Sequence, residues 1–194
     1  DEVFYEVVKN LRVGVTEIEV ARDIDYLMQA KGAEGTSFVT GVTFEGTGKR
    51  DRAEIGRAEN VYLEPGMHIA FDFGCVYEGY CSDFGRTVYC GRPDAKRTEI
   101  HKLVMGAQAA GIAAMVSEKA RASEIDRVVR SKIDAAGYGE WFWHRLGHGI
   151  GRDVHEAPFL TSSDDTVLAA GMCFTVEPGI FIPGLSSVRV EDVV

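Results

Sequence analysis

Two aspartates stand inside FDFGCVYEGYCSDFGRTV, residues 71–88, which otherwise resembles a pair of β-strands. Period-two alternation puts Phe71 on an apolar face and Asp72 on the opposite one, and Asp83 lies in the second strand-like run. A buried carboxylate costs several kcal/mol unless it is paired, hydrogen-bonded or bound to a metal. Both side chains are therefore candidate metal ligands. The alternative is structural, with Asp83 contacting Arg86 and Asp72 contacting a lysine or solvent.

Further polar groups follow in the second half of the chain. Glu177 ends the short apolar run of MCFTVEPG, and Glu191 alternates with valines in SVRVEDVV. Three of the five histidines fall within HRLGHGIGRDVHEAP, residues 144–158. Among them His148 stands between two glycines, which permit close approach of the backbone to a site. A solvent-exposed surface alone does not explain so many carboxylates and imidazoles in strand-like sequence.

Two divalent cations with shared carboxylates would account for this set, because each carboxylate offers two oxygens and the metal charge offsets the cost of burial. Such a centre converts a bound water into hydroxide at neutral pH and polarises a substrate carbonyl. One imidazole with four carboxylates is an oxygen-rich ligand set, which favours Mn, Fe, Co or Zn over copper.

The elements that must position these groups form two similar halves. Residues 16–32 and 123–137 each predict an amphipathic helix, with capping residues at the start and a glycine at the end. Each follows another helix-like segment, residues 2–10 and 98–118, and each precedes strand-like sequence. We therefore predict an α+β fold built from a duplicated order of elements.

Composition narrows the class of protein. The 194 residues suit one domain, or two fused halves, and carry a net charge of −9. A negatively charged protein is not expected to bind nucleic acid, which requires clustered lysines and arginines. No apolar run is long enough to span a bilayer. The four cysteines show no CxxC spacing, so the default prediction is a cytoplasmic protein.

Four segments together closely resemble the M24 metallopeptidases, the family that contains methionine aminopeptidase, aminopeptidase P and prolidase. They are DFGCVYEGYCSDFGRT, HRLGHGIGRDVHE, TVEPG and VRVEDVV, and they occur in the family's order. The resemblance covers about residues 16–194. It implies the pita-bread fold, in which a curved antiparallel sheet carries helices on its convex side and the metals lie centrally between pseudo-symmetric halves.

The same resemblance implies a site. The family's five metal ligands fall on Asp72, Asp83, His148, Glu177 and Glu191. Asp72 would chelate one of two divalent ions, Asp83 and Glu191 would bridge both, and the remaining two would complete the second. Manganese is the expected ion, with cobalt, zinc or iron as alternatives.

Further residues carry roles implied by the match. His155 would contact the scissile amide or the tetrahedral intermediate, and Glu177 would also take the proton of the attacking water. His144 and Arg189 match residues of the prolidase and aminopeptidase P branch. The expected activity is hydrolysis of the N-terminal Xaa-Pro bond of dipeptides or short peptides by a metal-bridging hydroxide. The aromatic residues 141–143 would line a proline pocket or belong to the core.

One departure from the family pattern weakens the substrate assignment. Residues 37–60 contain no histidine, where relatives carry one in the active site. Lys49, Arg50 or Arg52 would replace it, or the substrate is not a typical peptide. The alternatives are a hydrolase or lyase of small non-peptide amides such as ectoine, and a non-catalytic binding module.

The organisation of the whole protein is a further expectation. Residues 1–194 would form a pita-bread catalytic domain, the C-terminal domain of a longer chain. By the same resemblance the full-length protein would be a homodimer that acts on small peptides, with no nucleic-acid or membrane partner.

Overall fold

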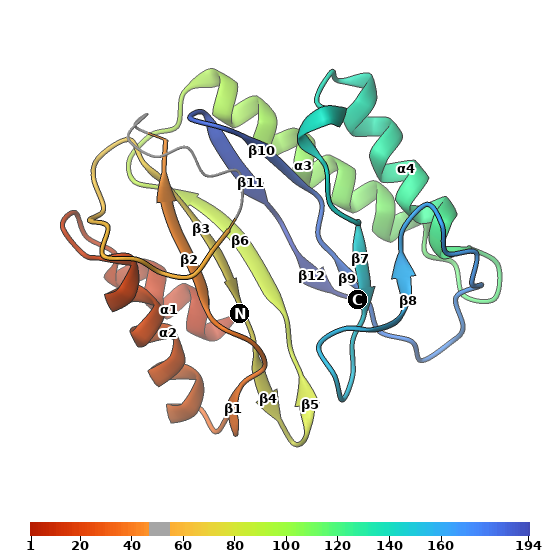
Figure 1. Cartoon of the computed structure of the whole chain (residues 1–194), viewed down its shortest axis with the longest axis horizontal. Coiled ribbons are helices and arrows are strands. Elements are labelled where there is room, and N and C mark those ends of the chain that lie inside the picture. Colours follow the sequence, from red (N-terminus) through yellow and green to blue (C-terminus); the bar gives the residue numbers. More distant parts are fainter. Residues whose placement is uncertain (47–54) are drawn as a thin grey trace.

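The computed structural model describes residues 1–46 and 55–194 (Figure 1). The helices are α1 (Glu2–Asn10), α2 (Glu17–Ala30), α3 (Ala95–Ala114), α4 (Ala122–Ala135) and a 3-10 turn, η1 (Gly139–Trp141). The strands of the first half are β1 (Gly35–Thr36), β2 (Gly41–Glu45), β3 (His68–Phe73), β4 (Cys75–Tyr77), β5 (Tyr80–Cys81) and β6 (Phe84–Tyr89). Those of the second half are β7 (Gly147–Gly149), β8 (Glu156–Leu160), β9 (Thr175–Val176), β10 (Gly179–Ile182), β11 (Ser186–Arg189) and β12 (Asp192–Val193). Within these ranges, no helix is both long and apolar enough to cross a membrane.

The predicted duplication is visible in the order of elements and in the cores. Helices α1 and α2 precede β1–β6, and α3 and α4 precede β7–β12, with the two helix pairs flanking the strands in Figure 1. One buried apolar cluster comprises side chains between Val3 and Phe73, and a second comprises side chains between Ile100 and Val190. Each half therefore packs its own helices against its own strands.

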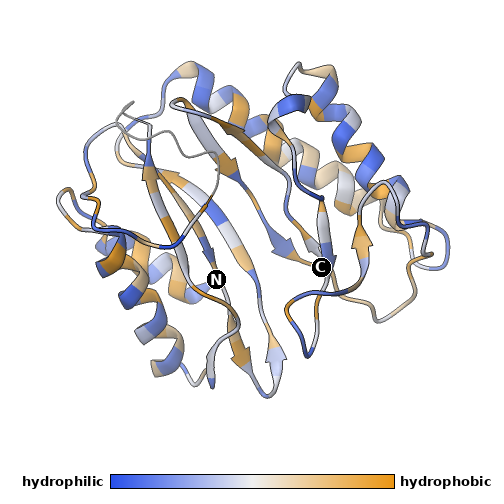
Figure 2. Ribbon diagram, in the orientation of Figure 1, coloured by the Kyte–Doolittle hydropathy of each residue, from blue (hydrophilic) through white to orange (hydrophobic). Residues whose placement is uncertain are grey.

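Helix α2 begins where the capping signal predicts. Thr16 Oγ1 accepts a hydrogen bond from Glu19 N at 3.1 Å, and the Glu19 carboxylate accepts one from Thr16 N at 2.8 Å. Val20 and Ile24 are buried on one face, and the hydropathy colours of Figure 2 show mixed hydrophobic and hydrophilic residues along the helix. Because the capping interactions are local, sequence alone predicts this boundary.

Helix α4 begins earlier than predicted. Its cap is Arg121, whose N–H donates to Glu124 Oε2 at 3.1 Å, so Ser123 lies inside the helix. Arg121 also forms an antiparallel bridge with Val167, as Thr16 does with Tyr62 in the first half. This contact with a distant segment fixes the start of α4.

The predicted strand pair of residues 71–88 is present. β3 lies between β2 and β6, antiparallel to both, and places Phe71 opposite Arg86. Glu78 and Gly79 have φ of 49° and 75°, the left-handed values of a two-residue hairpin turn between β4 and β5. Asp83, however, lies in the extended link between β5 and β6 rather than within a strand.

The two halves meet where β6 faces β11 and the segment before β12. Thr87 Oγ1 accepts a hydrogen bond from Arg189 N at 3.2 Å. Glu191 N donates to Gly85 O at 2.9 Å, in an isolated antiparallel bridge. Glu191 therefore lies between β11 and β12, not within a strand as predicted. This junction carries acidic side chains from both halves.

Candidate metal centre

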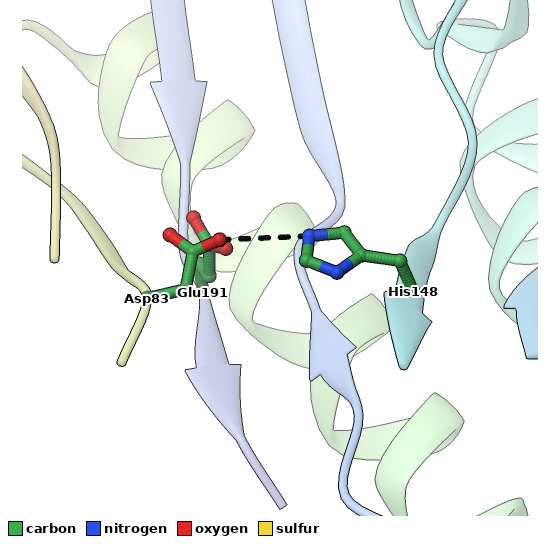
Figure 3. A group of neighbouring side chains, drawn as sticks. All are labelled: Asp83, His148 and Glu191. Carbon is green, nitrogen blue, oxygen red and sulfur yellow. Dashed lines mark ion pairs between the residues drawn. The ribbon is translucent and has the colours of Figure 1, made fainter. Parts of the chain in front are cut away.

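Three of the five predicted ligands form a compact group at this junction. Asp83 comes from the link before β6, His148 from β7, and Glu191 from the segment between β11 and β12. Their potential ligand atoms all lie within 4.8 Å of one another. In Figure 3 the two carboxylates lie side by side and the imidazole points toward them, with His148 Nε2 3.5 Å from Asp83 Oδ2. This arrangement suits a divalent cation.

The group is buried, and one oxygen of each of its carboxylates accepts no hydrogen bond from the residues that the structure describes. Glu191 is 1% exposed and Asp83 is 8% exposed. Within the described chain, Asp83 Oδ1 and Glu191 Oε2 accept no hydrogen bond. Burial raises the pKa of Glu191 well above its ordinary value, because removal from water disfavours the carboxylate. A cation would add a ligand bond at these oxygens and more positive charge than Arg189 alone provides, so the donor set fits a metal.

The tautomer of His148 also suits ligation. Nδ1 lies 2.9 Å from Gly149 O, and because a carbonyl only accepts, this nitrogen carries the hydrogen. Nε2 lies 3.5 Å from Asp83 Oδ2 and 3.5 Å from Glu177 Oε1. Burial opposes protonation of His148, but the hydrogen bonds to Asp83 and Gly149 and the charges of Glu177 and Asp83 together outweigh it and raise its pKa. Nε2 is therefore the atom available to a cation in place of a proton.

The remaining two predicted ligands contact Arg189. Its Nη2 lies 2.6 Å from Asp72 Oδ2 and 3.1 Å from Glu191 Oε2, and its Nη1 lies 3.6 Å from Glu177 Oε2. Burial would lower the pKa of Arg189, but the charges of these carboxylates raise it, so the guanidinium stays charged. Among the described residues, Asp72 pairs with Arg189 rather than with a lysine, and Arg86 pairs with Asp192 rather than with Asp83.

The five predicted ligands and Arg189 line one cleft of about 550 Å³. His155 lies in its wall, with its ring 4.4 Å from that of His148 between centroids. Burial and the neighbouring His148 lower the pKa of His155, so its imidazole is neutral at pH 7. The apolar part of the cleft comprises Phe38, Ile55, Trp143, Val154 and Phe181.

The aromatic residues 141–143 divide between the core and the cleft. Phe142 is 1% exposed and belongs to the core of the second half, against which Trp141 packs. Trp143 is 59% exposed and faces the cleft, with its ring 5.9 Å from that of Phe181. Phe142 and Trp141 therefore belong to the core, whereas a proline pocket at Trp143 stays a prediction.

His144 is held neutral in the cleft wall. Nδ1 lies 2.7 Å from Arg145 O, and Nε2 has no hydrogen-bond partner in the described chain. Burial, aided by the charge of Arg189, lowers the pKa of His144 from 6.5 to about 4. Its uncharged ring lies 5.5 Å from that of Phe181 between centroids, in an edge-to-face contact.

We expect this burial to make stability depend on pH. Between pH 6.5 and about 4 the unfolded chain protonates at His144 while the folded one does not, so the free energy of unfolding falls as pH drops through this window. The contribution is about 2–3 kcal/mol at pH 4.5. Urea unfolding at pH 7 and pH 4.5 should show a smaller loss of unfolding free energy for His144→Gln than for the wild type. An equal loss in both proteins would contradict this expectation.

The two glycines that flank His148 allow other backbone segments to pack closely beside it, as their positions predict. A Cβ on Gly147 would lie 1.9 Å from Thr175 O, and one on Gly149 would lie 2.7 Å from Glu156 O. Gly85 allows a similar close approach to Glu191, because a Cβ there would lie 2.4 Å from Glu191 Oε2. This glycine was not identified from the sequence, although its position two residues after Asp83 indicates a place near the site.

Thr175 was also overlooked. Its Oγ1 accepts from His148 N at 3.0 Å and donates to Glu177 Oε1 at 3.1 Å, so one hydroxyl orients two candidate ligands. We expect Thr175→Val to lower the affinity for a divalent cation by roughly 10–100-fold, the usual range for groups that orient ligands. Thr175→Ser should keep most of the affinity, and Thr36→Val on exposed β1 should have no effect on it. Failure of the serine variant to recover would contradict the assigned role.

The predicted replacements for the missing histidine, Lys49, Arg50 and Arg52, lie outside the described residues. Of the residues that the structure does describe in 37–60, Phe38 and Ile55 line the cleft. Both are apolar, so they contribute shape rather than a proton donor.

Comparison with known proteins agrees with this geometry. The model of Metallopeptidase family M24 matches residues 1–194. The chain is 46% identical over 184 residues to an Xaa-Pro dipeptidase of Lactobacillus delbrueckii subsp. lactis, a match that covers 94% of this chain and 49% of that protein. It also resembles the solved X-Pro aminopeptidase of Thermotoga maritima, with a TM-score of 0.92, 38% identity, and coverage of 100% of this chain and 54% of that one.

The prolidase of Pyrococcus furiosus gives a TM-score of 0.92 at 36% identity, over 100% of this chain and 56% of that one. These matches confirm the predicted α+β, pita-bread architecture. The chain spans about half the length of the curated relatives it matches.

Proposed function

The chain belongs to metallopeptidase family M24, and from that premise we propose that it hydrolyses the N-terminal Xaa-Pro bond of dipeptides or short peptides with divalent cations bound at the acidic junction. The observation that carries this proposal is the buried group of Asp83, His148 and Glu191, whose ligand atoms lie within 4.8 Å of one another. Similarity to Xaa-Pro dipeptidases at 38–46% identity supports the substrate class.

Five residues would hold two cations, with manganese as the expected ion. They are Asp72, Asp83, His148, Glu177 and Glu191. When bound, the cations would supply a hydroxide nucleophile at neutral pH and polarise the substrate carbonyl. Arg189, which contacts three of these carboxylates, would orient them and limit their mutual repulsion.

Glu177 is the proposed general base. Burial raises its pKa, which favours proton transfer near neutral pH, and the Thr175 hydroxyl fixes the orientation of its carboxylate. The neutral imidazole of His155 would donate a hydrogen bond to the oxygen or nitrogen of the scissile amide. Both side chains line the same cleft, so they can act on one bound substrate.

The apolar wall of the cleft suits a proline ring. Trp143, neutral His144 and Phe181 have ring centroids 5.5–5.9 Å from one another. Such a surface binds a compact apolar ring. We therefore place the proline side of the substrate against these rings.

The proposal extends to the whole protein. Residues 1–194 would be the catalytic domain of a longer chain, which would be a homodimer by the family resemblance. Light scattering of the full-length protein would show a dimer. The four free cysteines support a reducing cytoplasm as its compartment.

Product analysis tests the activity. Manganese-loaded protein is mixed with Ala-Pro, Ala-Pro-Ala and Met-Ala-Ser, and mass spectrometry identifies the products, with Asp83→Asn as the control variant. Cleavage before proline, lost in the variant, is the expected result, and the peptide consumed distinguishes dipeptidase from aminopeptidase. Intact peptides in a folded, metal-loaded sample would overturn the proposal and favour the hydrolysis of non-peptide amides.

A further inference from the structure

A buried amide on α3 connects the two segments that carry the candidate glutamate ligands. Gln108 is 7% exposed, and its Nε2 lies 3.0 Å from Val176 O and 3.2 Å from Val190 O. Val176 directly precedes Glu177, and Val190 directly precedes Glu191. One side-chain amide therefore holds the backbone next to both carboxylates.

The same nitrogen also lies 3.1 Å from Asp192 Oδ2, on the other side of Glu191 along the chain. All three partners are oxygens without hydrogens, so the NH₂ group of Gln108, not its carbonyl, must face them. Two N–H groups serve three acceptors, and the hydrogen-bonding capacity of this nitrogen is fully used. No rotation of the amide would satisfy the same partners.

The segments joined by Gln108 pair directly for only a short distance. Val176 is opposite Asp192 and Thr175 is opposite Val193 in the β9–β12 ladder. Beyond this ladder, the backbones of Glu177 and Glu191 diverge toward different contacts, with Leu146 O and Gly85 O respectively. Gln108 bonds at the point where the pairing ends, so it sets the spacing at the two ligands.

Helix α3 is a rigid support for this amide. Val104 and Ala107 are fully buried in the core of the second half. Gly111 brings the helix against its neighbours, because a Cβ there would lie 2.6 Å from Val129 Cγ2 and 3.5 Å from Val176 Cγ1. Movement of the Gln108 amide therefore requires movement of a packed helix.

Asp192 is fixed from its other side as well. Arg86 donates from Nη2 to Asp192 Oδ1 and from Nη1 to Glu191 O. Contacts from both halves of the fold therefore hold the chain on either side of Glu191.

From this geometry we propose that Gln108 is a positioning residue, which fixes Glu177 relative to Glu191 so that both carboxylates bind cations. The inference rests on the proposed function, because it assumes that these glutamates are ligands.

Substitution of the amide by an apolar group of similar length tests the role. Gln108→Met removes both N–H groups and leaves the carbonyls of Val176 and Val190 without this donor. We expect manganese affinity, measured by isothermal titration calorimetry, to fall by roughly 10–100-fold, as for other residues that orient ligands. Should Gln108→Met fail to fold, Gln108→Asn retains an amide that is one methylene too short and should show the same direction of change.

A packing variant of the same helix separates positioning from stability. Val104→Ala should lower the free energy of unfolding by creating a cavity in the core, yet leave manganese affinity at the wild-type value. Wild-type affinity in Gln108→Met, or an affinity loss in Val104→Ala matched to its stability loss, would overturn the positioning role alone. A wild-type protein that binds no manganese would overturn the proposed function and this inference together.

Discussion

Glu191→Gln is expected to lower kcat/KM for an Xaa-Pro peptide by at least about 1,000-fold, equivalent to about 4 kcal/mol of activation free energy. The substitution preserves shape at a side chain that is 1% exposed. It replaces a carboxylate oxygen by an NH₂ group or a neutral carbonyl, and either change removes the charge that would bind a cation. Nη2 of Arg189, 3.1 Å from Glu191 Oε2, would also lose an ionic partner.

Steady-state kinetics and calorimetric titration with manganese would measure this effect. Glu140→Gln, the same change at an exposed position, should behave as the wild type. We expect the metal-free Glu191→Gln protein to remain folded, because the variant no longer buries a carboxyl group whose pKa burial raises. Wild-type manganese affinity in Glu191→Gln would exclude this residue as a ligand.

Gly147→Ala should be the most damaging of the small substitutions near the centre. The added Cβ would lie 1.9 Å from Thr175 O and 2.8 Å from Thr175 C, so β7 and the segment before Glu177 must separate. Both contacts are with backbone atoms, which no rotamer change relieves. We expect a loss of at least about 3 kcal/mol in the free energy of unfolding, together with a loss of manganese affinity as His148 moves.

Gly35→Ala provides the matched control, because a Cβ at Gly35 would meet no atom within 4 Å and its backbone is not left-handed. Chemical unfolding of both variants compares the two positions directly. A Gly147→Ala protein as stable as Gly35→Ala would show that β7 can move away from Thr175 without cost. Such a result would contradict the close packing that we hold responsible for the position of His148.

Local rules predicted the elements whose determinants are local. The Thr16 and Glu19 capping interactions, for example, lie within one turn of the helix predicted for residues 16–32. The start of α4 was predicted wrongly because its cap, Arg121, is also bridged to Val167. A boundary set by a segment more than forty residues away leaves little trace in local sequence.

The candidate ligands were predictable for a different reason. Carboxylates in apolar strand-like sequence are costly, so Asp72 and Glu177 are conspicuous without knowledge of the fold. The residues that support them are not conspicuous. Gln108 donates to backbone carbonyls 68 and 82 residues away, and no local pattern in the sequence of α3 reveals such partners.

The ion pairs of the site were also not predictable from local sequence. Arg189 was identified only by its match to the prolidase and aminopeptidase P branch. Its ion pairs with Asp72, Glu177 and Glu191 depend on side-chain directions that follow from the contact of β11 with β3 and β6. The guanidinium compensates part of the acidic charge. Two carboxylate oxygens, on Asp83 and Glu191, still accept no hydrogen bond in the described chain, which is why we assign cations to this junction.

Anomalous X-ray diffraction from crystals of the manganese-loaded protein would test this assignment most directly. Data collected above and below the manganese absorption edge locate the ion without reference to activity or substrate. We predict anomalous density at the junction, within coordination distance of Asp83, His148 and Glu191. Density found only at other positions, in crystals shown to contain manganese, would contradict the account.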